Sequence, residues 1–124
     1  MKTNKFIKVL IADDNVQFCE FVKKYLEKVE YINIIGVVHN NEDEITSIEN
    51  NKPDLVITDL KRKDNSTIEI IEKYKCLKFL IITGSFLEAY KIKTENIIGI
   101  INKPFSDYSI ILERINEAFY FLNL

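Results

Sequence analysis

The sequence predicts an α/β fold in which a doubly wound, five-stranded parallel sheet is covered by helices on both faces. Five short segments are almost continuously apolar and rich in β-branched residues, as expected of strands that are buried on both faces. Between them, apolar residues recur every three or four positions, which is typical of one face of a helix. Strand and helix alternate five times without a linker or repeat, so we expect a single domain over residues 1–124 with right-handed crossovers.

The expected strands share this apolar character and occupy residues 6–12, 32–38, 54–58, 79–83 and 96–101. The expected helices fill the intervals: 15–30, 42–50, 67–74, a short segment within 86–93, and a last helix after residue 107. The first helix should bury an apolar face: Val16, Cys19, Val22, Leu26 and Val29. The last should bury another: Ile110, Ile111, Ile115, Ala118 and Phe119. Ser106 or Asp107 is the expected N-cap of that last helix.

Composition excludes several classes of protein. The net charge of −2 gives no support for binding nucleic acid or an anionic membrane. No apolar run reaches the roughly 18 residues that a membrane span needs, and the N-terminus lacks the organisation of a signal peptide, so we expect a cytoplasmic protein. Cys19 and Cys76 are far apart and should be reduced, packed thiols. His39 is the sole histidine and should be a structural or surface residue.

Polar residues follow four of the predicted strands where each strand ends: Asp13 and Asp14, Asp59, Thr83 and Lys103. Because ligands of such sheets sit beyond the carboxyl ends of the strands, we expect these side chains in one pocket. Converging carboxylates repel one another unless a cation joins them, and oxygen ligands suit Mg²⁺. A hydroxyl and an ammonium beside that metal are suited to a phosphoryl group, and a carboxylate could accept it.

Each of these residues also has an ordinary structural interpretation. Asp13 or Asp14 could cap the first helix, and Asp59 could form a turn. Thr83 alone is a common strand residue, and Lys103 alone is a solvated surface charge. Their joint placement at four strand ends favours the phosphoryl site.

The chain resembles the receiver domain of two-component response regulators over its whole length. The matching motifs are LIADDN at 10–15, PDLVITDL at 53–60, IITGS at 81–85 and INKPF at 101–105. The resemblance implies a flavodoxin-like fold with strand order 2-1-3-4-5 and five helices. The opening IKVLIADDN, followed by INIIGVVHN, is most similar to sporulation-type regulators of low-GC Gram-positive bacteria.

This resemblance implies a role in phosphorelay signal transduction. Asp59 would be the phosphoacceptor, with a sensor histidine kinase or histidine phosphotransfer protein as donor. Asp14 would bind Mg²⁺ directly, Asp13 mostly through water, and Asp59 and the backbone carbonyl of Lys61 would complete the protein ligands. Such a protein is no conventional enzyme, although it catalyses its own aspartyl phosphorylation and dephosphorylation.

The remaining implied roles concern the bound phosphoryl group and its readout. Lys103 would pair with Asp59 and then with the phosphoryl oxygens, while Thr83 would hydrogen-bond the transferred group. The Lys103–Pro104 peptide is cis in this family. The added charge of about −1.5 to −2 would bias a surface formed by the fourth helix, fifth strand and fifth helix, which acts on a downstream protein. A phosphorylation-dependent dimer is left open.

Three features depart from the family pattern: one residue, one loop and the positive charge of that loop. Ile100 lies three residues before Lys103, where the family usually has an aromatic ring that moves together with Thr83. The loop after Asp59 contains KRKDNST in place of the usual Met-Pro and Asp-Gly. Its basic residues Lys61, Arg62 and Lys63 either belong to a solvated loop or supply charge that attracts the phosphodonor or partly replaces Mg²⁺.

These departures keep a second function open, a degenerate receiver that binds a partner without phosphorylation. A third candidate, an aspartyl phosphohydrolase, would need an acid two residues after Asp59, where the chain has Lys61. No helix-turn-helix follows the last predicted helix, so we expect no direct nucleic-acid binding by this domain.

Overall fold

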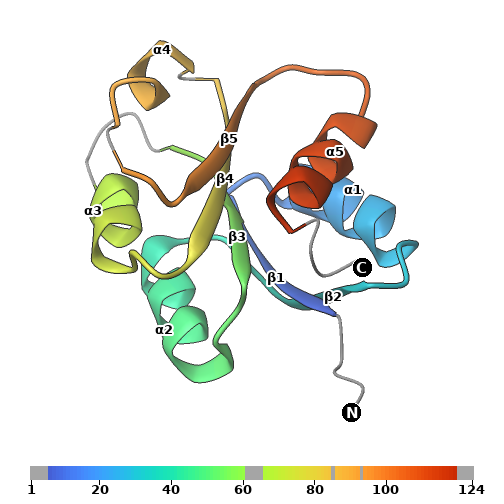
Figure 1. Ribbon diagram of the computed structural model, residues 1–124, viewed down its shortest axis with the longest axis horizontal. Coiled ribbons are helices and arrows are strands. Elements are labelled where there is room, and N and C mark those ends of the chain that lie inside the picture. Colours follow the sequence, from blue (N-terminus) through green and yellow to red (C-terminus); the bar gives the residue numbers. More distant parts are fainter. Residues whose placement is uncertain (1–5, 61–65, 85, 93, 120–124) are drawn as a thin grey trace.

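The apolar segments pair side by side into a five-stranded parallel sheet with the order β2-β1-β3-β4-β5 (Figure 1). The computed structural model describes residues 6–60, 66–84, 86–92 and 94–119. The strands are β1 (Ile7–Ala12), β2 (Ile32–Val38), β3 (Leu55–Thr58), β4 (Lys78–Thr83) and β5 (Ile97–Asn102). The α/β fold and the strand order expected from the resemblance are confirmed.

Helices occupy the intervals that the sequence predicts: α1 (Val16–Glu27), α2 (Asn41–Asn51), α3 (Ser66–Lys73), α4 (Phe86–Ala89) and α5 (Ser109–Ala118). α1 and α5 lie on one face of the sheet, and α2 and α3 lie on the other (Figure 1). α4 is only a single turn of four residues. Within the described ranges, no helix has the length and apolar character needed to cross a membrane.

Successive residues of the interior strand β1 enter opposite cores. Val9 and Ile11 of β1 pack against α1 and α5, whereas Leu10 and Ala12 pack against α2 and α3. All four are buried, because side chains alternate between the two faces of a strand and both faces are covered. This double burial explains why the strand sequences are continuously apolar.

Two details of the predicted helices are wrong. Val16 was expected on the buried face of α1 but is 55% exposed. It is the first residue of the helix and lies just beyond the end of β1, where little of the sheet remains to cover it. At the start of α5 the N-cap is Tyr108, without a side-chain cap, while the carboxylate of Asp107 accepts a 3.0 Å hydrogen bond from the backbone N–H of Ser109.

The two cysteines differ in their environments. Cys19 is buried, as predicted, but Cys76 is exposed, which corrects the expectation of two packed thiols. Cys76 lies in the short connection between α3 and β4, and its backbone position does not direct its side chain into either core. Neither thiol forms a disulfide.

Asn96 connects the start of β5 to the end of α3. Its side-chain amide donates hydrogen bonds of 2.9 Å to the carbonyl of Ile71 and 3.1 Å to the carbonyl of Tyr74. These are carbonyls of the kind that a helix end leaves without an intrahelical partner. Asn96→Ala should therefore lower the free energy of unfolding by about 1–3 kcal/mol, measured by urea denaturation. Asn50→Ala, at an exposed position of α2, is the control, and equal stability of the two variants would contradict this role.

Candidate functional site

Three carboxylates meet at the carboxyl edge of the sheet. Asp13 and Asp14 follow β1 and Asp59 follows β3, and these strands are paired so that Ala12 lies opposite Thr58. One carboxylate oxygen from each aspartate lies within 4.8 Å of the others. Asp13 is buried, Asp59 is half-buried and Asp14 is exposed. The register of two neighbouring strands thus creates the acidic cluster predicted from the sequence.

Lys103 reaches this cluster from the end of β5. Its Nζ lies 2.8 Å from Oδ2 of Asp13 and 3.7 Å from Oδ2 of Asp59. Its backbone N–H donates a 2.9 Å hydrogen bond to the carbonyl of Thr83, and its peptide bond to Pro104 is cis, as the resemblance implies. The ammonium is therefore shared between two carboxylates, with the shorter contact to Asp13.

Asp13 is held from several sides. Its Oδ1 accepts a 2.9 Å hydrogen bond from the N–H of Asn15. Its carbonyl oxygen accepts a 3.3 Å hydrogen bond from the Cys19 thiol and lies 2.9 Å from Nδ1 of His39. A carbonyl oxygen can only accept, so His39 carries its proton on Nδ1. His39 thus has the structural role that the sequence predicts, because it fixes the backbone of Asp13.

The charges and hydrogen bonds of the cluster are compatible with a bound cation. Burial raises the pKa of Asp13 above its ordinary value, and the hydrogen bond from Lys103 opposes this increase. Oδ1 of Asp59 is buried, and the residues that the structure describes offer it no hydrogen-bond partner. Among the residues that the structure describes, three carboxylates and one ammonium meet here, so the cluster has more acidic than basic groups. This donor set, made only of oxygens, fits Mg²⁺.

The Cys19 thiol is inert despite its place beside the cluster. Burial raises its pKa to about 11, and the negative charge of Asp13 adds to this increase. Cys19 therefore stays protonated at neutral pH and contributes packing and a hydrogen bond rather than a nucleophile.

The three other residues discussed for the site differ in where the structure places them. Thr83 is buried at the end of β4 and lies opposite Asn102 of β5, which places its backbone beside that of Lys103. Lys61, whose carbonyl is expected to bind the metal, lies outside the described residues. Ile100 is half-buried in β5, lies opposite Ile81 of β4 and packs against the core beneath α2 and α3.

Sequence reasoning missed Phe18, whose ring centroid lies 4.4 Å from Nζ of Lys103. Its ring contacts those of Phe105 and Tyr108, and Tyr108 also contacts Tyr25. We call these four residues the aromatic cluster: Phe18, Tyr25, Phe105 and Tyr108. The available signal was position, because Phe18 lies in the first turn of α1, four residues after Asp14 and three after the N-cap Asn15.

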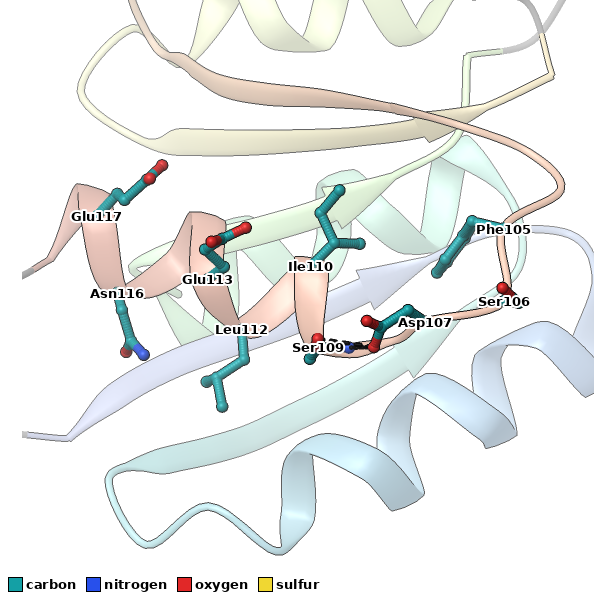
Figure 2. A pocket seen from close by; sticks show the side chains of 9 residues that line it. All are labelled: Phe105, Ser106, Asp107, Ser109, Ile110, Leu112, Glu113, Asn116 and Glu117. Atoms are coloured by element: carbon teal, nitrogen blue, oxygen red, sulfur yellow. Dashed lines mark hydrogen bonds between the residues drawn. The ribbon is translucent and has the colours of Figure 1, made fainter.

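A surface depression of about 970 Å³ lies on α5 and the loop before it (Figure 2). Its walls combine apolar and acidic side chains: Phe105, Ile110, Leu112, Asp107, Glu113 and Glu117. Arg114 lies 3.5 Å from the carboxylates of both Glu113 and Glu117 and partly neutralises this helix. The depression and the acidic cluster are separate features, because the depression is lined from α5 and not by the aspartates at the strand ends.

Comparisons with known proteins agree with this geometry. The family model of the response regulator receiver domain matches residues 9–116. Sensory transduction protein LytT of Bacillus anthracis is 28% identical over 109 residues, which are 85% of this chain and 44% of that protein. A protein-glutamate methylesterase/protein-glutamine glutaminase of Bacillus subtilis is 29% identical over 120 residues, which are 90% of this chain and 33% of that protein. The chain thus spans less than half the length of these curated relatives.

Solved structures show the same fold. The isolated receiver domain of RcsB from Salmonella enterica serovar Typhimurium, determined with the phosphomimetic BeF₃⁻, has a TM-score of 0.75 at 21% identity, covering 90% of this chain and 89% of that one. The response regulator domain of Thermotoga maritima CheB has a TM-score of 0.72 at 16% identity, covering 96% and 98%. Since the family model spans most of the chain and the fold agrees with it, this chain belongs to the response regulator receiver domain family.

Proposed function

We propose that Asp59 accepts a phosphoryl group, with Mg²⁺, from a sensor histidine kinase or a histidine phosphotransfer protein. The observation that supports this most is the sharing of one ammonium between two members of a three-carboxylate cluster: Lys103 contacts both Asp13 and Asp59. Receiver domains bind Mg²⁺ at an acidic pocket of this kind. The cluster supplies a nucleophile, ligands for a cation and a fixed positive charge.

Asp59 is the nucleophile in this proposal. Its side chain is 19% exposed, so a donor can approach it, whereas Asp13 is almost fully covered. A carboxylate oxygen of Asp59 forms a bond to phosphorus while the P–N bond of the donor phosphohistidine breaks. The electron pair leaves with the imidazole nitrogen, which takes up a proton from solvent.

The charges around Asp59 lower the barrier to this transfer. When bound by Asp13, Asp14 and Asp59, Mg²⁺ supplies positive charge that offsets the repulsion between the carboxylates and the incoming phosphoryl oxygens. Lys103, which follows the carboxyl end of β5, provides a second positive charge 3.7 Å from Asp59. We assign Thr83 the role of hydrogen-bonding the phosphoryl group after transfer, and the Lys61 carbonyl that of a further metal ligand.

The proposed output is a protein contact rather than nucleic-acid binding. The net charge of −2 gives this domain no electrostatic attraction for phosphates of a duplex. We propose that the charge added at Asp59 changes a surface that a downstream protein reads in the cytoplasm. Dimerisation on phosphorylation stays a prediction.

A second function is favoured by one observation. Ile100 occupies the position of the usual aromatic switch and packs, half-buried, against the core beneath α2 and α3. A receiver without that ring could act as a binding module whose partner surface does not depend on phosphorylation. The two functions differ in whether Asp59 takes up a phosphoryl group at all.

Intact mass after incubation with acetyl phosphate separates these functions. We expect one phosphoryl adduct in the wild type, formed only when Mg²⁺ is present, and none in Asp59→Asn. In this reaction the P–O bond breaks and acetate leaves with the electron pair, so no donor protein is needed. A folded wild-type protein that gains no adduct would favour the binding module, and an adduct in Asp59→Asn would move the acceptor to another residue.

A further inference from the structure

The ammonium of Lys103 has a third neighbour besides its two carboxylates. The ring of Phe18 lies with its centroid 4.4 Å from Nζ, within the range of a cation–π contact. Phe18 is in the first turn of α1, and its backbone N–H donates a 3.0 Å hydrogen bond to the side chain of Asn15, the N-cap of that helix. The backbone that carries the ring is therefore fixed beside the acidic cluster.

Other rings of the aromatic cluster hold the Phe18 ring in place. Phe105 approaches it nearly edge-on, with centroids 6.1 Å apart and an interplanar angle of 82°. Tyr108 contacts both, at 6.5 Å from Phe18 and 4.9 Å from Phe105. Since Phe105 and Tyr108 lie between β5 and α5, the Phe18 ring is packed between α1 and that connection. Its position is thus set by tertiary packing as well as by its own helix.

A lysine side chain needs packing contacts of this kind to keep its ammonium in one position. Its four-carbon side chain has many rotamers, and holding the ammonium in one place costs conformational entropy. Lys103 is 23% exposed, so water competes for its charge on one side. The negative face of an aromatic ring attracts the ammonium and excludes water from the side that the carboxylates leave open.

We propose that Phe18 is a positioning residue for Lys103, and that its ring face holds the ammonium beside Asp13 and Asp59 before the phosphoryl group arrives. This inference rests on the proposed phosphorylation of Asp59. The ring itself touches no reacting atom in this proposal. Its contribution is to orient the charge that the phosphoryl oxygens meet, so that this orientation need not be established during the reaction.

This role is tested by substitutions that change the electrostatic potential of the ring face separately from the size of the ring. The rate of adduct formation from acetyl phosphate at saturating Mg²⁺ is measured by intact mass. Phe18→Leu should be about three- to tenfold slower than wild type, the range of a partly exposed cation–π contact. Phe18→Tyr should keep nearly the wild-type rate. Pentafluorophenylalanine at position 18, which keeps a ring but reverses the charge of its face, should be as slow as leucine.

Controls exclude a general effect on α1 or on metal binding. Phe21→Leu alters a ring on the same helix that is 58% exposed, and it should leave the rate unchanged. Calorimetric titration should show that Phe18→Leu binds Mg²⁺ at least as tightly as wild type, so that a slower rate does not come from weaker metal binding. In a Lys103→Met background, Phe18→Leu should have no further effect, because the partner of the ring is gone.

A spectroscopic measurement tests the contact without phosphorylation. Protons on the carbon next to Nζ of Lys103 should show an upfield ring-current shift in the NMR spectrum of wild type. Phe18→Leu should remove the shift, and Phe21→Leu should retain it. Absence of that shift in wild type would overturn the inference.

The outcomes distinguish this inference from the function on which it rests. No adduct in wild type would overturn the phosphorylation of Asp59 and the positioning role together. An adduct that forms at equal rates in wild type, Phe18→Leu and the pentafluoro protein would leave phosphorylation standing and overturn only the role of Phe18. The same holds if the pentafluoro protein reacts as fast as wild type and only leucine is slow, since the rate would then depend on ring shape.

Discussion

Lys103→Met is expected to slow phosphorylation of Asp59 by about 100-fold and to strengthen Mg²⁺ binding in the same protein. The rate falls because the phosphoryl oxygens lose a fixed positive charge that lies 3.7 Å from the nucleophile. Metal affinity rises because the ammonium now occupies Oδ2 of Asp13 at 2.8 Å and competes with the cation for that oxygen. Without it, three carboxylates converge with no positive partner from Lys103, and their repulsion is relieved by the metal.

Two measurements on Lys103→Met test this prediction. Adduct formation from acetyl phosphate gives the rate, and calorimetric titration gives the Mg²⁺ affinity. Lys91→Met is the matched control, since Lys91 is a solvent-exposed lysine whose ion pair with Glu88 lies in and beside α4. A fall in both the rate of adduct formation and the Mg²⁺ affinity would show that Lys103 holds the carboxylates close together for the metal rather than competing with it.

Phe79→Ala is expected to cause a large loss of stability, about 3–5 kcal/mol in the free energy of unfolding. Phe79 is fully buried in β4 and packs in the core beneath α2 and α3. Its removal exchanges many close contacts for a cavity that the surrounding strands cannot fill by relaxing. Urea denaturation followed by circular dichroism gives the value for each variant.

The control for this prediction changes the same residue type at the surface. Phe21→Ala, at a position that is 58% exposed, should alter the free energy of unfolding by no more than about 0.5 kcal/mol. Equal losses for the two variants would mean that burial does not decide the cost of losing a phenylalanine in this domain.

The parts of the fold that follow from local composition could be predicted from the sequence. Continuous apolar runs identified the strands, because both faces of the sheet are covered. The register between strands was beyond such reasoning. β1 and β2 slip by one residue between Val9 and Leu10, which brings Leu10 opposite Gly36. A Cβ at Gly36 would lie 3.3 Å from Cδ1 of Leu10, so the fit depends on one particular side chain of the neighbouring strand.

The candidate site also has features that the sequence predicts and others that it does not. Asp13, Asp14 and Asp59 could be placed together because topology brings the ends of paired parallel strands to one edge. The preference of Lys103 for Asp13 over Asp59 depends on the reach of a flexible side chain, which spacing along the chain does not encode. Phe18 was missed for a related reason, since its contact joins α1 to the end of β5 across 85 residues of sequence.

The unequal environments of the two thiols make this domain convenient for chemical labelling. Cys76 is exposed and precedes β4, so it lies at the amino edge of the parallel sheet, across the molecule from the aspartates. Cys19 is buried in the core, and its thiol stays protonated at neutral pH because its pKa is raised to about 11. A maleimide dye added to the folded protein therefore has one accessible attachment point, which the natural sequence already provides. A fluorophore placed there would report on partner docking without entering the acidic cluster.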